Sequence, residues 1–233
     1  MGIIIQPTDN VQWKNPASLS FDGSTEYMTF DGLAGDIDTD VGTISAWVKL
    51  DSTTSNGAVL KASVDTSNLL AISYNNSAEK IQMTYKAGGS AKVADAAFAF
   101  ENNDTWYNVV GTYNTSEDYV KIAVNGEVLD TTTGLGTWSG TIDKCYGGRN
   151  TVASNSFWEG HITNIAYWAS DLTNKVLWIY NNGTPGNLLA LEPHRLKLWL
   201  NMAEQSGTSV HDSSGLANNA TLLNTPTWST DKP

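Results

Sequence analysis

Thr43-Ile44-Ser45-Ala46-Trp47-Val48-Lys49-Leu50 is the stretch that decides the fold, because its side chains alternate between two faces. Successive residues of a β-strand point to opposite sides, so the apolar residues at the even positions share one face. We expect that face to lie in a core, with Trp47 on the opposite face. The alternation is typical of an antiparallel sheet.

A second alternating stretch, Tyr119 to Val124, ends in the dipeptide Asn125-Gly126. Asn-Gly between alternating segments is a strong signal for a β-hairpin, whose return is expected at Glu127 to Leu129. The side chains expected in the core are Val120, Ile122 and Val124. Further strands are expected at residues 17–22, 26–30, 57–62, 69–74, 80–86, 106–113, 142–147, 157–168 and 196–201.

One segment departs from the strand pattern. Apolar residues at positions 172, 176, 177, 179 and 180 fit one face of a helix. Asp171 or Ser170 can cap its start, and Gly183 can end it. We therefore expect one short helix packed on the edge of an otherwise all-β chain that no linker divides.

Charge and cysteine content exclude several classes of protein. The 233 residues include 24 acidic and 13 basic side chains, a net charge of −11, with no local cluster of Lys and Arg. Such a surface repels phosphate backbones, so we expect no nucleic-acid partner. Cys145 is the only cysteine, so no internal disulfide can form. The first residues lack the features of a signal peptide, and no apolar run approaches a membrane span. We expect synthesis in a host cytoplasm and no membrane insertion.

Four segments follow one another in an order that is more specific than any of them alone. They are Leu19-Ser20-Phe21-Asp22-Gly23-Ser24 with Tyr27; Thr43 to Val48; Trp106 to Tyr113 with Val120 to Gly126; and Phe157-x-x-Gly160-x-Ile162 with Tyr167-Trp168. Together they resemble the laminin G-like family of the concanavalin A-like lectin and glucanase superfamily. The tail, Leu198 to Thr208 with Asp212 to Gly215, resembles a segment that often precedes the first motif in that family.

The resemblance implies an all-β, two-sheet antiparallel jelly-roll sandwich with one short helix, formed by residues 1–233 as a single laminin G-like domain. Members of the family bind glycans, proteins or calcium, and many are attachment modules. As an acidic protein without a signal sequence, the chain also resembles proteins encoded by bacterial viruses of aquatic habitats. That likeness lies at the level of the fold.

The sequence lacks the residue sets that hydrolysis needs. Concanavalin-like glucanases cluster carboxylates on one strand, because a pair must flank the scissile bond. The glutamates here stand singly, at positions 26, 79, 101, 117, 127, 159, 192 and 204. His161, His194 and His211 show no zinc-ligand spacing. We therefore expect no enzymatic activity.

Two aromatic residues are candidates for ligand binding. Trp47 and Tyr119 lie on the faces opposite the aliphatic residues of their own strands, where an exposed ring could stack on a sugar. The alternative is that loops cover this face and make both residues structural.

Two aspartates are candidates for a structural calcium ion. By resemblance, Asp22 and Asp212 lie in motifs near the place where the chain ends should meet. The alternative is that both cap turns through side-chain hydrogen bonds. The acidic loop Asp36 to Gly42 resembles a calcium loop less well, because position 47 is Trp where an EF-hand has Glu.

Two functions follow from these observations. The first is a non-catalytic structural or adhesive protein on a virion surface, a capsid decoration or appendage, that associates through its sandwich edge. Its partner would be a viral capsid, another protein shell or itself as a homo-oligomer. The second is a stand-alone, calcium-assisted lectin for cell-surface glycans. The apolar flanks, Ile3 to Ile5 and Leu222-Leu223 with Trp228, either add a strand to a neighbour or fold back onto their own sheet.

Overall fold

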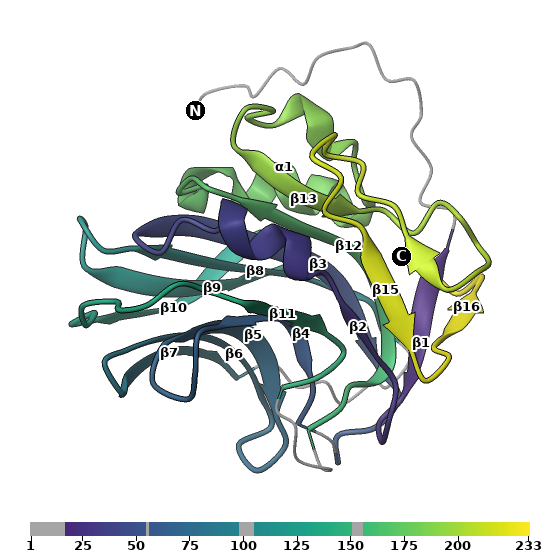
Figure 1. The fold of residues 1–233 in the computed structure, drawn as a ribbon, viewed down its shortest axis with the longest axis horizontal. Helices are drawn as coiled ribbons and strands as arrows, with labels where there is room; N and C mark the ends of the chain where they lie inside the picture. Colours follow the sequence, from purple (N-terminus) through teal and green to yellow (C-terminus); the bar gives the residue numbers. More distant parts are fainter. Residues whose placement is uncertain (1–16, 55, 98–104, 151–155) are drawn as a thin grey trace.

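The computed structural model describes residues 17–54, 56–97, 105–150 and 156–233. The chain forms two antiparallel sheets that pack face to face as two layers, one above the other in Figure 1. This arrangement confirms the predicted all-β jelly-roll sandwich with one short helix. Ile3 to Ile5 lies outside the described residues.

Sheet A has the strand order β10-β9-β8-β3-β12-β1-β16, and β13 pairs with β12 beside this path. The strands are β10 (Glu127–Thr133), β9 (Tyr119–Val124), β8 (Tyr107–Asn114), β3 (Val41–Leu50), β12 (Glu159–Trp168), β1 (Ser18–Asp22), β16 (Thr227–Ser229) and β13 (Leu196–Leu200).

Sheet B has the order β14-β15-β2-β11-β4-β5-β6-β7. Its strands are β14 (Ser209–Val210), β15 (Ala220–Leu223), β2 (Tyr27–Thr29), β11 (Lys144–Gly147), β4 (Ala58–Ser63), β5 (Leu69–Asn75), β6 (Lys80–Ala87) and β7 (Ser90–Ala96). Each strand expected from the sequence is present with small shifts at its ends, whereas β7, β14, β15 and β16 are additional.

The main core lies between the two layers and confirms the predicted alternation. Val120, Ile122 and Val124 of β9 are at most 1% exposed and belong to this core. The hairpin after β9 has the predicted turn, since Asn125 and Gly126 both have positive φ, 50° and 82°. A two-residue type I′ turn requires this conformation at both positions.

A second apolar cluster covers the outer face of sheet A. Helix α1 (Val176–Tyr180) and the chain around it lie on this face, on the side away from sheet B in Figure 1. The cluster joins side chains of the sheet, the covering segment and β13: Val110, Ala123, Ala166, Trp168, Leu172, Val176, Ile179, Leu188, Leu191, Leu196 and Trp199. The central part of sheet A is therefore buried on both faces, as the unbroken burial along most of β3 shows.

The helix is shorter than predicted and ends earlier. A 3₁₀ turn, Thr173–Lys175, leads directly into α1. The N-cap position is Leu172, so neither Asp171 nor Ser170 occupies it, but the Asp171 side chain accepts a hydrogen bond from the Thr173 N–H at 3.0 Å. Asn181 ends α1 in a left-handed conformation with φ 48°, which corrects the prediction of Gly183.

The C-terminal segment folds back onto the first strands of the chain. Strand β16 pairs with β1, with Trp228 opposite Leu19, and β15 pairs with β2, with Leu222 opposite Met28. The apolar pair Leu222-Leu223 therefore completes its own sheet, which is the second of the two alternatives for this flank.

The core makes a quantitative prediction for β9. Ile122→Ala removes a fully buried side chain and should lower the free energy of unfolding by about 2–5 kcal/mol, because the site cannot collapse completely. Thr131→Ala on the exposed side of β10 is the control and should change it by less than about 0.5 kcal/mol. Chemical denaturation measures both values. An Ile122→Ala loss no larger than that of the control would contradict the register of β9.

Candidate functional site

Trp47, a predicted ligand residue, lies under the segment that covers sheet A. Its side chain points away from the main core, as predicted, but is only 3% exposed. The ring stacks on Tyr180 with centroids 5.8 Å apart and an interplanar angle of 24°. A sugar could reach the face of Trp47 only by displacing α1, so its surroundings favour the structural alternative. Its ligand role stays a prediction.

Tyr119 lies at the start of β9 and is partly exposed. Its hydroxyl donates a hydrogen bond to the Asp171 carboxylate, and the Lys121 ammonium lies 3.6 Å from the centre of its ring. Burial, and then the hydrogen bond to Asp171, raise the pKa of Tyr119 to about 12. The ring thus helps to fix the start of the helical segment. Its role in ligand binding also stays a prediction.

Asp22, a predicted metal ligand, has both carboxylate oxygens occupied by its own turn. Oδ1 accepts from the N–H groups of Ser24, Thr25 and Glu26 at 2.9, 2.9 and 3.1 Å. Oδ2 accepts from the hydroxyls of Ser24 and Thr25 at 2.7 and 2.9 Å. Burial opposes ionisation, but these hydrogen bonds outweigh it and hold the pKa of Asp22 well below its usual value.

Asp212 caps a second turn and is 1% exposed. Oδ1 accepts from the N–H groups of Trp199 and Ser214, each at 2.9 Å. Oδ2 accepts from the Ser214 hydroxyl at 2.7 Å and the Asn218 N–H at 3.0 Å. Among the described residues, no three His, Cys, Asp or Glu side chains gather in a way that could hold a metal ion. Calcium at Asp22 or Asp212 stays a prediction, which a melting temperature unchanged by calcium would remove.

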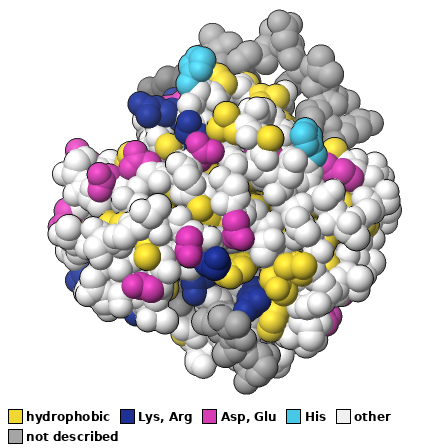
Figure 2. Space-filling model, viewed as in Figure 1, with side chains coloured by type: hydrophobic (Ala, Val, Ile, Leu, Met, Phe, Trp, Pro, Cys, Tyr) yellow, Lys and Arg dark blue, Asp and Glu magenta, His cyan; other side chains and the backbone are white. Residues whose placement is uncertain are grey.

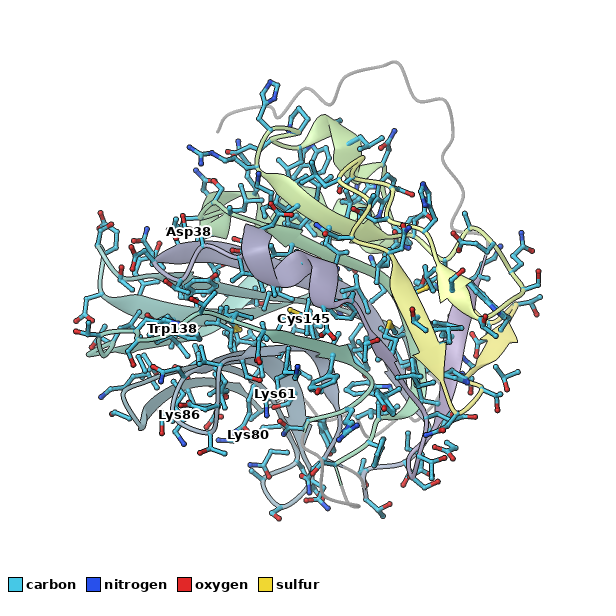
Figure 3. The ribbon with its side chains drawn as sticks, in the orientation of Figure 1. Asp38, Lys61, Lys80, Lys86, Trp138 and Cys145 are labelled. Atoms are coloured by element: carbon cyan, nitrogen blue, oxygen red, sulfur yellow. The ribbon has the colours of Figure 1, made fainter. Side chains whose placement is uncertain are left out.

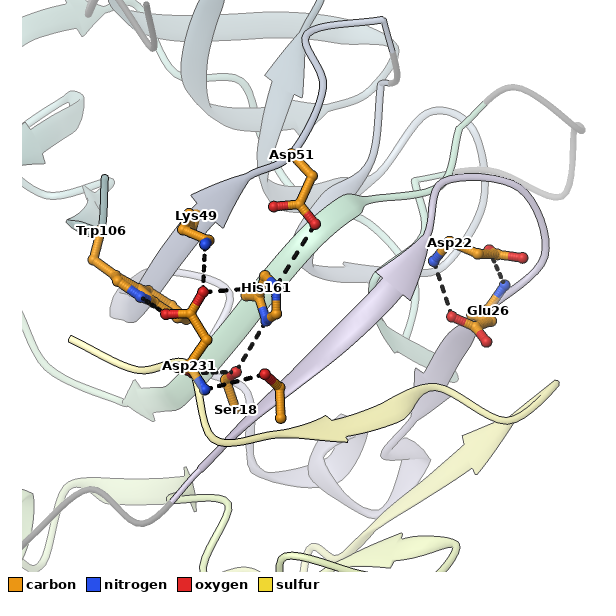
Figure 4. A network of polar contacts seen from close by, with 9 residues as sticks. Ser18, Asp22, Glu26, Lys49, Asp51, Trp106, His161 and Asp231 are labelled. Atoms are coloured by element: carbon orange, nitrogen blue, oxygen red, sulfur yellow. Dashed lines mark hydrogen bonds and ion pairs between the residues drawn. The ribbon is translucent and has the colours of Figure 1, made fainter. Parts of the chain in front are cut away.

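A polar network on the outer face of sheet A joins the chain tail to β3 and β12 (Figure 4). Asp231 pairs with the Lys49 ammonium and accepts from the Trp106 indole N–H at 2.9 Å. Its backbone carbonyl accepts from the Ser18 hydroxyl at 2.7 Å. Burial opposes ionisation of Asp231, but the hydrogen bonds from Lys49 and Trp106 lower its pKa.

The same network contains a Ser, a His and an Asp in contact. Ser18 Oγ lies 3.2 Å from His161 Nδ1, and His161 Nε2 lies 3.6 Å from the Asp51 carboxylate. A nucleophile must reach its substrate, whereas Ser18 is fully buried and its hydroxyl also bonds to the tail. Burial lowers the pKa of His161 despite the nearby Asp51. We assign this network to holding the tail rather than to chemistry.

Sheet B offers a different surface, because its outer face is only partly covered. Side chains of β6 alternate between buried and half-exposed positions along the whole strand. The buried positions are Ile81, Met83, Tyr85 and Ala87, and the half-exposed ones are Lys80, Gln82, Thr84 and Lys86. The outward side chains of β2, β4 and β11 continue this face, and Lys61, Lys80 and Lys86 all lie in the lower layer of Figure 3, with Lys80 and Lys86 towards opposite ends of β6.

Aromatic rings border this face on the side of β2 and β11. Tyr27 and Tyr146 meet edge to face, with centroids 6.2 Å apart. The Arg149 guanidinium lies 4.6 Å from the centre of the Tyr27 ring, 5.3 Å from that of Tyr146 and 5.7 Å from that of Phe157. These contacts are in the range of cation–π attraction and hold the rings in place.

Positive charge gathers beside these rings. The Lys61 ammonium donates to the Asn150 carbonyl at 2.5 Å, which brings it next to Arg149 in the chain. Burial first, and then the charges of Arg149 and Lys86, lower the pKa of Lys61. In Figure 2, Lys and Arg side chains lie beside hydrophobic ones below the centre of the view.

Sequence reasoning missed this cluster because its members come from separate strands. No run of Lys and Arg exists in the chain, and residues 61, 86 and 149 become neighbours only when the sheet forms. The alternation of Lys80 to Lys86 was a usable signal, since it predicts a strand with one face at the surface.

Comparison with known proteins supports the fold. A family described as the concanavalin A-like lectin/glucanases superfamily matches residues 22–176. No curated protein matches the chain in sequence. Within the described residues, none of the helices has the length and apolar character that a membrane span needs.

Several solved structures share the fold at low sequence identity. A provisional carbohydrate-binding protein from Bacteroides ovatus has a TM-score of 0.60 and 17% identity; the match covers 92% of this chain and 62% of that protein. The CBM40 of the Ruminococcus gnavus IT-sialidase, bound to α2,3-sialyllactose, has a TM-score of 0.57 and 15% identity, with coverage of 70% and 96%. A heptameric SAP-like pentraxin from Limulus polyphemus has a TM-score of 0.54 and 12% identity, with coverage of 71% and 82%.

The network around the tail makes a prediction about stability. Asp231→Asn removes the carboxylate that faces Lys49 and should lower the free energy of unfolding by about 1.5–3 kcal/mol, the usual range for a hydrogen bond to a charged group. Asp143→Asn is the matched control, because Asp143 pairs with Lys144 at 3.7 Å on an exposed surface and should cost less than about 1 kcal/mol. Equal melting temperatures for the two variants would contradict the assignment.

Proposed function

The chain belongs to the concanavalin A-like lectin/glucanases superfamily, and we propose that it is a non-catalytic binding protein that holds a carbohydrate on the outer face of sheet B. The observation that carries the proposal is the half-exposed pair Tyr27 and Tyr146, which lies beside Lys61 of β4, with the polar side chains of β6 farther along the same face. Sugar-binding surfaces combine these two features, a ring for the apolar face of a pyranose and polar groups for its hydroxyls.

The rings of Tyr27 and Tyr146 are preorganised for contact with a sugar. Arg149 is 8% exposed and its guanidinium lies against both rings, so this contact restrains their positions. Preorganised aromatic side chains lose little conformational entropy on binding, and this favours affinity. Thr84 and Gln82 on β6 supply hydroxyl and amide groups within the same face.

The opposite face of the sandwich gives less support. The segment around α1 lies over Trp47, and the tail lies over Lys49 and His161, so a ligand there would compete with the protein's own chain. Two of the similar structures carry descriptions that name carbohydrate binding or a bound saccharide. Their identity to this chain is low, so they support the choice of a carbohydrate only as analogy.

A second proposal is supported by a separate surface. Val128 and Leu129 on the edge strand β10 are 37% and 38% exposed, and Leu177 of α1, which contacts the β9–β10 hairpin near Gly126, is 55% exposed. An apolar sheet edge of this kind can pair with another chain. In this proposal, residues 1–233 form one laminin G-like domain of a virion, a decoration or appendage that associates with a capsid or with its own copies.

A paired substitution tests the carbohydrate proposal. Tyr146→Ala should weaken binding to glycans found on an array by about tenfold or more, equivalent to about 1.4 kcal/mol, because it removes a stacking ring. Tyr119→Ala on sheet A is the matched control and should leave the affinity unchanged, with far-UV circular dichroism checking the fold of both variants.

Each other outcome assigns the function elsewhere. Loss of binding in Tyr119→Ala alone would move the site to sheet A, as the sequence first suggested. Absence of binding to any glycan, together with self-association that Leu129→Lys abolishes, would replace the lectin by the structural protein.

A further inference from the structure

We infer that the carbohydrate held on sheet B carries an anionic group, a carboxylate or a sulfate, which Lys61 and Lys86 bind while Arg149 supplies positive charge from behind. The inference rests on the proposed function and names the chemical class of its ligand. It concerns the cationic cluster formed by Lys61, Lys86 and Arg149.

The sheet register places the two lysines so that both can reach one group. Lys61 lies opposite Ala71, Ser63 lies opposite Leu69, and Leu69 lies opposite Lys86. Lys61 and Lys86 are therefore two strands apart and offset by one same-face position, a backbone separation of about 12 Å. The Lys61 ammonium lies against the Asn150 carbonyl, and the Lys86 side chain projects from the same face of the sheet, so Lys86 can approach an anionic group held at Lys61.

The cluster is unfavourable without an anion. Burial is the largest cause of the lowered pKa of Lys61, and the positive charges of Arg149 and Lys86 lower it further because like charges repel. The amino-acid composition does not force basic residues together, because acidic residues outnumber basic ones, 24 to 13. Basic residues are the minority in this chain, and grouping them at one place has a cost in stability. Such a group indicates a ligand of negative charge.

The lysines at the edges of the face are held differently from Lys61. Lys80 pairs with Asp95 at 3.3 Å, and Lys144 lies 3.7 Å from Asp143. Lys86 acts on the exposed carboxylate of Asp65, whose pKa it helps to lower. Within the described part of the chain, Lys61 has no carboxylate at ion-pair distance, and its ammonium donates to a backbone carbonyl. Among these described lysines, Lys61 is therefore the one that a ligand carboxylate or sulfate could pair with.

The rings and the charge together define the shape of the ligand. Tyr146 lies directly opposite Lys61 in the register of β11 and β4, so the stacking ring and the ammonium are cross-strand neighbours. A pyranose on Tyr146 would hold an attached carboxylate or sulfate over Lys61. Arg149 is mostly buried and contacts the rings, so it acts as a positioning residue and through its field rather than by touching the ligand.

The experiment uses the full chain and an array of glycans in matched sets, each with the same neutral core unmodified, sulfated or capped with a carboxylate-bearing sugar. We expect the anionic members to bind at least tenfold more tightly than their neutral cores, and the preference to fall between 50 and 500 mM salt as charges are screened. The sulfated and carboxylated members distinguish the two sources of charge.

Substitution of single lysines then locates the charge. Lys61→Gln should remove most of the preference for the anionic members, and Lys61→Arg should restore it. Lys80→Gln on the same face of sheet B is the matched control, because Lys80 already pairs with Asp95. Lys61→Gln should also leave the melting temperature unchanged or raised, since it relieves repulsion.

The failures of the two proposals can be told apart. Equal binding of neutral and anionic glycans, still sensitive to Tyr146→Ala, would overturn the anionic ligand and leave the carbohydrate proposal intact. The same holds for a preference that Lys61→Gln does not change. Absence of binding to every glycan would overturn both.

Discussion

The burial of β3 on both faces is the constraint on which the rest of the structure depends. Its even-numbered apolar side chains face sheet B, while Trp47 is apolar on the other side and must also leave water. Burying a large ring stabilises the fold by about 2–3 kcal/mol, so a covering layer is favoured. The segment that includes α1 supplies that layer with Ile179 and Leu188, and Tyr180 stacks on the ring. The outer face of sheet A around Trp47 thereby becomes interior.

The hydrogen bonds of Asp22 and Asp212 and the network around Asp231 hold the C-terminal strands against the first strands of the chain. Because β15 and β16 from the chain end pair with β2 and β1, the turns that connect these strands are fixed by short-range hydrogen bonds. Asp22 and Asp212 each use both oxygens for this purpose. Asp231 extends the attachment across sheet A to Lys49 and Trp106. Asp22 and Asp212, the predicted metal ligands, thus use their carboxylates to stabilise the turns at the ends of the sandwich.

Much of the fold could be predicted from the sequence, because strand period and turn chemistry act locally. The register of β9, with its buried Val120, Ile122 and Val124, follows from period two and Asn125-Gly126. Strand β7 was missed because Ser90 to Ala96 has little apolar contrast between its faces. The end of α1 was misplaced because Asn181 adopts the left-handed conformation before Gly183 can. The candidate site was missed, since Lys61, Arg149 and Tyr146 meet only through the order of strands in sheet B.

The net charge of −11 and an anionic ligand are compatible because charge acts over a limited range. At physiological ionic strength the Debye length is about 8 Å, so an anionic group beside Lys61 is influenced mainly by Lys86 and Arg149. Carboxylates on distant loops are screened from it. A nucleic acid is different, because its phosphates repeat every few ångströms and would run from this face onto the acidic surface around it. The same distribution of charge therefore admits a saccharide with one or two anionic groups and disfavours a long polyanion.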